Sequence, residues 1–172
     1  MSPDDAVGFE SDSPILQKIN TARELYAVWH ADLTQDREIA GLLSSLKEAA
    51  GRSFSVMVDL GVVAACMRCE EEEGGSCCGA GIENRYSPVL LLINLLLGKS
   101  LPDHRKIPRS CFFLGERGCT LWARHILCIN YLCSKIQGML DHEALAVLQS
   151  TTGKEMDILF AVNEAIKKRL RF

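Results

Sequence analysis

Residues 87–98 read SPVLLLINLLLG, and this stretch is the clearest guide to the fold. Ser87 before Pro88 predicts a helix start, because a serine side chain caps free backbone N–H groups and proline suits the first helical turn. Gly98 predicts the helix end, since glycine tolerates the left-handed conformation that closes many helices. The apolar run between them spans nine residues and is interrupted by Asn94, whereas a membrane-spanning helix needs about 20. We therefore expect an apolar helix within a folded domain and no membrane span.

Two amphipathic helices are predicted upstream of this stretch, one beginning at Ser13-Pro14 and one following Asp36. Their apolar residues recur at three- and four-residue steps, as on one face of a helix. These residues are Ile15, Ile19, Ala22, Tyr26, Trp29 and Leu33 in the first, and Ile39, Leu42, Leu43 and Leu46 in the second. Gly51 is the expected end of the second helix, and the two are expected to form a helical hairpin. Residues 1–12 are polar and acidic, which predicts a frayed tail.

The remaining segments are also predicted to be mainly helical. Residues 54–66 (FSVMVDLGVVAAC) suit either a buried strand or a helix, and helix is favoured because no other segment offers a strand partner. Residues 99–120 form a long connection that something other than regular structure must hold. One helix is expected over 121–138, and another after Asp141, weakened at Thr151-Thr152-Gly153. The predicted architecture is all-α: a flexible tail over 1–12, then a single domain over 13–172 that is a helical bundle with two irregular cysteine-rich metal-binding loops.

Composition excludes several classes of protein. The chain has 172 residues, 48% hydrophobic and 24% charged, so it can bury a core and is not disordered overall. A net charge of −3 argues against general binding of nucleic acid, which needs a strongly basic surface. No basic residue precedes Lys18, so no secretory signal is visible. We expect a cytoplasmic protein with no nucleic-acid or membrane partner, while a protein partner stays open.

Eight cysteines fall into two groups of four along the chain. The first group is Cys66, Cys69, Cys77 and Cys78, and the second is Cys111, Cys119, Cys128 and Cys133. In a reducing cytoplasm clustered thiols are more often metal ligands or redox groups than disulfides, and each four can complete a tetrahedral thiolate set. Nearby glycines supply tight returns, at 74–75, 79, 81, 115 and 118. All eight cysteines are therefore candidate metal ligands.

Other roles for these residues stay open. Free cysteine is among the most buried residue types, so core packing is the alternative for each thiol. It is strongest for Cys133, because on one predicted helix Cys128 and Cys133 would lie about 140° apart. Residues 99–124 carry six basic side chains and two acidic ones. This excess of positive charge would offset an anionic metal–thiolate centre, and the alternative is a solvated basic loop. Glu70–Glu73 is expected to be a solvated run, and His125 is left open as a ligand.

The cysteine pattern resembles a known family. Cys66-x2-Cys69 with Cys77-Cys78, followed by CFFLGERGCTLWARHILC over 111–128, is similar to the bacterial and archaeal CxxCxxCC family, described as chelating zinc or iron. The resemblance covers residues 66–133 and is most specific in its second half. The chain departs from the family in the longer gap between Cys69 and Cys77, and in His125, where proline usually follows arginine. Related modules occur in flagellin lysine methylases, where an iron–sulfur cluster is implied. The ligands implied by the resemblance are Cys66, Cys69, Cys77, Cys78, Cys111, Cys119 and Cys128.

Three functions compete at this stage. The first is a protein that holds an iron–sulfur cluster, with [4Fe–4S] the first expectation, for electron transfer, sensing or activation of a partner. It is favoured by the adjacent Cys77-Cys78 pair, which crowds one zinc ion but can reach different irons of a cluster. The second is a structural zinc protein with four-thiolate sites, or an interaction module. The third, a thiol–disulfide oxidoreductase using Cys66 and Cys69, lacks the βαβ setting typical of such motifs. No glycine-rich cofactor loop supports methyl transfer.

Overall fold

The computed structural model describes residues 14–73 and 77–171 of the chain. Helices dominate this part, which confirms the all-α class, and the strands described within it form one short antiparallel hairpin. The predicted tail over 1–12 lies outside the described residues. In chain order the elements are α1 (Pro14–Gln35), α2 (Arg37–Asp59), α3 (Val62–Glu73), the 3₁₀ helix η2 (Ile82–Arg85), α4 (Pro88–Leu96), β1 (Leu114–Gly115), β2 (Gly118–Cys119), α5 (Ile126–Asn130), α6 (Ser134–Met139) and α7 (His142–Leu170).

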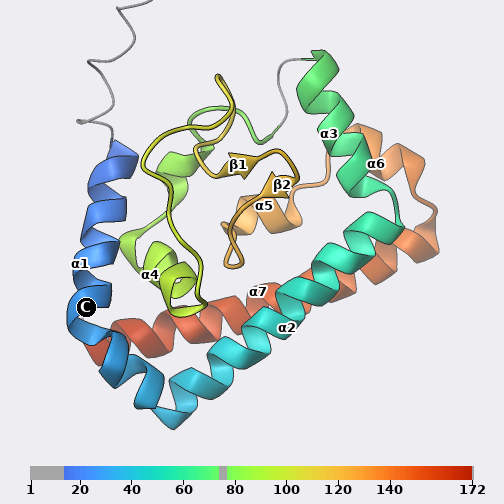
Figure 1. The fold of residues 1–172 in the computed structure, drawn as a ribbon. Helices are drawn as coiled ribbons and strands as arrows, with labels where there is room; N and C mark the ends of the chain where they lie inside the picture. The colour runs from blue at the N-terminus through green and yellow to red at the C-terminus, as the bar shows by residue number, and fades with distance from the viewer. Residues whose placement is uncertain (1–13, 74–76, 172) are drawn as a thin grey trace, which may run out of the picture.

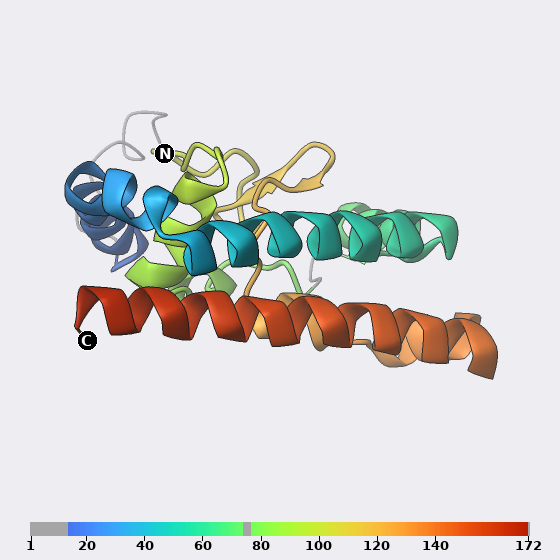
Figure 2. The same cartoon turned by 90° about the horizontal axis from the view of Figure 1, so that it is seen from below.

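Two long antiparallel helices, α2 and α7, form the base of the molecule (Figures 1 and 2). Helix α1 turns away from α2 and packs mainly against α4. The predicted hairpin of the first two helices is therefore wrong, because the main partner of α2 is the C-terminal helix. The remaining segments, from α3 to α6, lie on one side of the α2–α7 pair (Figure 1).

Helix α2 does not end at Gly51, as the sequence predicted, but continues to Asp59. A glycine inside a helix costs only about 1 kcal/mol relative to alanine, and α2 buries Ala50, Ser53 and Met57 around and beyond it. The chain leaves the helix at Gly61, which has a φ of 74° and separates α2 from α3. The predicted helix over 54–66 is thus present, but in two parts. No single helix among residues 14–73 and 77–171 is long and apolar enough to cross a membrane. Helices α2 and α3 taken together have the length and composition of a membrane span, but the chain bends by 75° between them.

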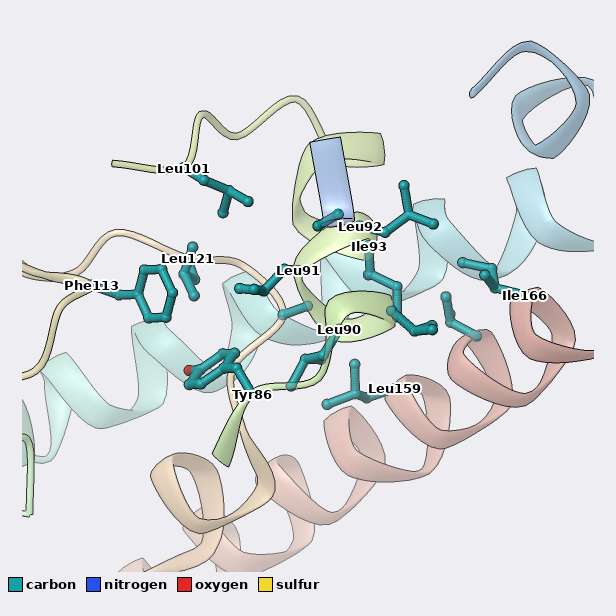
Figure 3. Packing of buried hydrophobic residues seen from close by; sticks show 14 of the residues in the cluster. Tyr86, Leu90, Leu91, Leu92, Ile93, Leu101, Phe113, Leu121, Leu159 and Ile166 are labelled. Atoms are coloured by element: carbon teal, nitrogen blue, oxygen red, sulfur yellow. The ribbon is translucent and has the colours of Figure 1, made fainter. Parts of the chain in front are cut away.

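The main core surrounds α4, the helix predicted from residues 87–98. The side chain of Ser87 accepts a hydrogen bond from the Leu90 N–H, and Gly98 follows the helix with a φ of 80°. Figure 3 shows Leu90, Leu91, Leu92 and Ile93 packed among residues from the loops and from α7. A second, smaller cluster consists of Met57, Val62, Ile136 and Leu148, and fills the space between α2, α3, α6 and α7.

The predicted helix over 121–138 is wrong in its extent. Residues 121–125 are irregular, α5 covers only Ile126–Asn130, and α6 begins at Ser134. The break places Cys128 within α5 and Cys133 at the N-cap of α6. The two cysteines therefore do not share one helix, and the separation of about 140° predicted for them is wrong.

Helix α7 runs without interruption through Thr151-Thr152-Gly153, where the sequence predicted a weak point. The hydroxyls of Thr151 and Thr152 donate to the carbonyl oxygens of Val147 and Leu148, one turn earlier. This local bonding keeps both hydroxyls satisfied within the helix. Thr152 and Glu155 are buried on the face that packs in the molecule. Tertiary packing along the whole helix thus outweighs its low local propensity.

Candidate metal centre

Seven of the eight candidate cysteines border one cavity of about 590 Å³. The cavity lies between α3, the β1–β2 hairpin, α5 and the start of α6. Its cysteines come from both sequence groups, which are more than thirty residues apart at their nearest members. They are Cys66, Cys77, Cys78, Cys111, Cys119, Cys128 and Cys133. The eighth, Cys69, lies one turn after Cys66 on α3.

The first group is held partly by a helix rather than by a loop. Cys66 and Cys69 lie on α3, while Cys77 and Cys78 follow in a turn. The expectation of an irregular loop is therefore wrong for Cys69, while Cys66 is the last residue of the helix predicted over 54–66. Gly81, after the pair, has a φ of 108°, a conformation that strongly favours glycine. Glycines 74 and 75 and the side chains of Glu70–Glu73 lie outside what the structure describes.

Backbone hydrogen bonds join the two cysteine segments directly. The N–H of Cys111 donates to the carbonyl oxygen of Cys78 at 2.5 Å, and the N–H of Ala80 donates to Arg109 at 3.0 Å. Gly79 and Ser110 form an antiparallel bridge between these bonds. The long connection over 99–120 is thus held in part by pairing with the first cysteine segment.

The β1–β2 hairpin presents Cys119 to the cavity. Leu114 pairs with Cys119, and Gly115 pairs with Gly118. Gly118 has a φ of 100°, and a Cβ on Gly115 would approach the Thr120 methyl group to 3.0 Å. The tight return before Cys119 therefore favours glycine at 118, while a side chain at 115 would require the Thr120 methyl group to move by a few tenths of an ångström.

Asn94 fixes the segment between Cys119 and Cys128. Its Oδ1 accepts hydrogen bonds from the N–H groups of Trp122 and Ala123 at 2.9 and 3.0 Å. Its Nδ2 donates to the carbonyl oxygens of Leu90 and Ala123. The side chain is completely buried, so these bonds are made without competition from water. Sequence reasoning noted Asn94 only as an interruption, although a lone amide in an apolar run is the signal of such a role.

Two cations of the basic connection lie near the thiols. Burial raises the pKa of the Cys119 thiol, and the charges of Arg124 and Lys99 oppose that rise. Arg124 also forms a buried ion pair with Glu155 of α7 at 3.2 Å, and Lys99 lies over the Trp122 ring. One other member of the basic run, Arg105, serves the fold, since it pairs with the buried Glu83 at 2.5 Å.

Burial favours the protonated form of three of the cavity thiols. Burial raises the pKa of Cys66 to about 11, and raises those of Cys78 and Cys111 to about 12. Neighbouring thiols raise these pKa values further, because two thiolates repel each other. A metal that binds here must therefore displace protons, which couples its affinity to pH.

Tyr86 is a second residue that the sequence did not reveal. Its ring is almost fully buried, and its hydroxyl accepts a hydrogen bond from the His125 N–H at 3.0 Å. A hydrogen bond from Tyr86 also lowers the pKa of the Cys128 thiol, although burial has the larger effect and raises that pKa.

The His125 ring itself does not border the cysteine cavity. Its Nδ1 accepts from the Leu127 N–H at 3.2 Å, and the residue borders a separate cavity of about 220 Å³ beside α7. His125 therefore caps α5 and is not brought to the thiols.

The thiols surround a space without meeting at one point. Among residues 14–73 and 77–171, no three cysteine, histidine or acidic side chains are arranged to hold a metal ion together. A tetrahedral zinc site needs sulfurs about 2.3 Å from the ion, hence under about 4 Å from one another. The donor set suits thiolate-bound metal, while a single ion at this position would require the side chains to converge. No family model, curated protein or solved structure matches this chain.

Proposed function

We propose that this chain is a metal-binding protein whose cysteines hold an iron–sulfur centre, with [4Fe–4S] the first expectation. The observation that carries the proposal is the meeting of seven cysteines from two distant segments around one cavity. Chance burial of unrelated thiols would scatter them through the core. Here all seven border the same cavity, and Cys111 alone among them is buried in the core.

The spacing of the thiols favours a cluster over one zinc ion. Iron–sulfur clusters are held by cysteine thiolates, and their irons offer separate binding points around a volume. A cavity of about 590 Å³ with thiols along its wall suits such an object better than a single ion does. Arg124 and Lys99 would offset the negative charge of a thiolate-bound centre. When bound, the cluster would supply one-electron chemistry or a sensing function.

Structural zinc is the second candidate, and the hydrogen-bonded Cys78–Cys111 junction favours it. Zinc there would staple α3 and the β1–β2 hairpin to the bundle and contribute to folding. The oxidoreductase candidate is weakened by the raised pKa of Cys66, because reactive thiols of such enzymes have lowered pKa values. The resemblance to the CxxCxxCC family fits either metal.

Anaerobic purification separates the two metals. An iron–sulfur protein should be brown, absorb broadly near ~400 nm, and contain equal amounts of iron and acid-labile sulfide. Cys128→Ser should lower this absorbance, because it removes one thiolate of the centre. Met67→Leu is the matched control, since Met67 borders the same cavity with a thioether and should not be a ligand. Colourless protein that contains zinc and no sulfide would reject the cluster and support the second candidate, and protein that takes up neither metal would reject both.

A further inference from the structure

We propose that the eight thiols form two metal centres whose ligand sets cross the order of the sequence. The α3 set is Cys66, Cys69, Cys77 and Cys133, and the hairpin set is Cys78, Cys111, Cys119 and Cys128. The adjacent residues Cys77 and Cys78 then serve different centres, and Cys133 joins the set that is most distant from it in the chain. This inference rests on the proposed metal-binding function and goes beyond it in the number and membership of the sites.

The packing of the two hydrophobic clusters separates the thiols in this way. Cys66 and Cys133 both pack against the smaller cluster, with Val62 and Ile136. Cys111 belongs to the main cluster around α4, and Cys78 packs against that same cluster. If the ligand sets followed the order of the sequence, Cys66 would share a centre with Cys78, and Cys133 with Cys111. The packing instead places the two members of each of these pairs on different clusters.

Hydrogen bonds complete the hairpin set. The Cys111 N–H donates to the Cys78 carbonyl oxygen, which keeps these two residues side by side. The β1–β2 hairpin returns the chain from Cys111 to Cys119, where the Leu114–Cys119 pair closes it. Tyr86 joins this group from the core, because its hydroxyl is hydrogen-bonded to Cys128.

Electrostatic neighbours agree with the same division. After burial, the thiols that raise the pKa of Cys66 are Cys77, Cys133 and Cys69, which are the other members of the α3 set. The thiols that raise the pKa of Cys111 are Cys119 and Cys128, both of the hairpin set. Cys77 also affects Cys78 and Cys128. It lies between the sets and goes to the α3 set because the hairpin set already has four members.

Charge distinguishes the two centres further. Arg124 and Lys99 both border the cavity. Arg124 lies between Cys119 and Cys128 in the chain, and Lys99 lies over the Trp122 ring of the same segment at 4.9 Å. Both of these thiols belong to the hairpin set. The hairpin centre therefore has two cations beside it, and we expect it to retain metal longer during chelation.

Two double variants with the same number of lost thiols test the pairing. Cys66→Ser with Cys133→Ser removes two ligands of the α3 set, so the protein should keep half of the wild-type metal. Cys66→Ser with Cys78→Ser damages both sets and should abolish metal binding. If the ligand sets follow sequence order, these two results exchange. Equal loss in both variants points to one shared centre and overturns the proposal.

Metal content of the wild-type protein keeps this test separate from that of the proposed function. Protein loaded anaerobically with Fe²⁺ and sulfide, or with Zn²⁺ alone, reports whether the chain binds metal at all. Only the ratio between the two double variants reports the pairing. The wild-type metal content should correspond to two equal centres per chain. A content that corresponds to one centre would overturn the pairing but would leave the proposed function standing.

Wild-type protein also gives a test that needs no variant to fold. After partial chelation, thiols that have lost metal are alkylated and located by peptide mass spectrometry. Cys133 should be alkylated together with Cys66 and Cys69, and before Cys111 and Cys119. Alkylation of Cys133 in step with Cys111 would overturn the crossed arrangement.

Discussion

At the scale of single residues, the cysteine cavity depends on polar groups that have no role as ligands. Asn94, Tyr86 and Glu155 are each buried and hydrogen-bonded, Glu155 to the partly buried Arg124. They tie the segment from Cys119 to Cys128 to α4 and α7. Buried polar groups of this kind are costly when a partner is lost, which makes their removal measurable.

Asn94→Ala should destabilise the protein and loosen the segment that carries Cys119. The N–H groups of Trp122 and Ala123 would lose their acceptor, at about 1–3 kcal/mol for each buried group left unpaired. Denaturant unfolding measures the loss. Asn163→Ala is the control, because Asn163 is a half-buried residue of α7 whose amide bonds to the side chain of neighbouring Glu164. We expect it to change stability by under about 0.5 kcal/mol. An equally small effect of Asn94→Ala would contradict the role of this side chain.

Arg124→Met should cost about 3–5 kcal/mol, because it leaves Glu155 buried without its charge partner. Adding Glu155→Leu should recover most of the loss, since a pair of apolar side chains replaces the pair of charges. A thermodynamic double-mutant cycle on metal-free protein measures this coupling. Strictly additive losses would show that the pair does not act as a unit.

The metal-free protein should lose stability as the pH rises above about 9. Thiols of the unfolded chain ionise near the ordinary pKa of 9.0, whereas those of Cys66 and Cys78 in the folded chain ionise near 11 and 12. A raised folded pKa gives stability that is complete below the unfolded pKa and lost as the pH rises toward the folded one. Tm measured between pH 8 and pH 11 should fall less steeply in Cys66→Ser/Cys78→Ser. Identical slopes would contradict the assigned pKa shifts.

At the scale of elements, two structures of different character meet. The α2–α7 pair is long, continuous and held by side-chain packing. The hairpin, α5 and α6 are short elements of two to six residues. Short elements of this kind have little stability of their own and depend on what joins them.

Metal removal should therefore release the cysteine-bearing elements before the base. Hydrogen exchange on chelated protein should become faster in α3, over 99–125 and in α5, while α2 and α7 stay protected. Leu148→Ala is the matched perturbation of the base, since Leu148 is fully buried in α7. It should cost about 2–5 kcal/mol with or without metal. Uniform loss of protection on chelation would show that the two parts unfold as one.

At the scale of the whole molecule, the chain places its metal candidates at the boundary between two hydrophobic clusters. Cys111 and Cys78 pack on one cluster, and Cys66 and Cys133 on the other. Metal bound on either side of this boundary would join segments that are distant in the chain, α3 with α6 on one side and the Cys78 turn with the β1–β2 hairpin on the other. Its binding energy would then add to the stability of the entire fold.

Chelation should accordingly lower the Tm of loaded protein by more than the loss of a single side chain does. A calorimetric scan before and after treatment with a chelator measures the change. Restoration of the original Tm by anaerobic addition of metal shows that the effect is reversible. A Tm that does not change on chelation would mean that bound metal contributes nothing to folding.

The sequence by itself determined the all-α class and most helix starts. Asp36, Ser87 and Asp141 each cap a helix through a local hydrogen bond, and local bonds are readable from neighbouring residues. It also predicted candidate metal ligands in both cysteine groups, because eight thiols in two groups are rarely accidental. Tertiary structure alone decided that α2 continues through Gly51, that residues 121–138 break, and which thiols become neighbours. These outcomes depend on contacts between distant segments, chiefly α2 against α7 and Asn94 against Trp122, whose energies exceed the local preferences that a sequence pattern records.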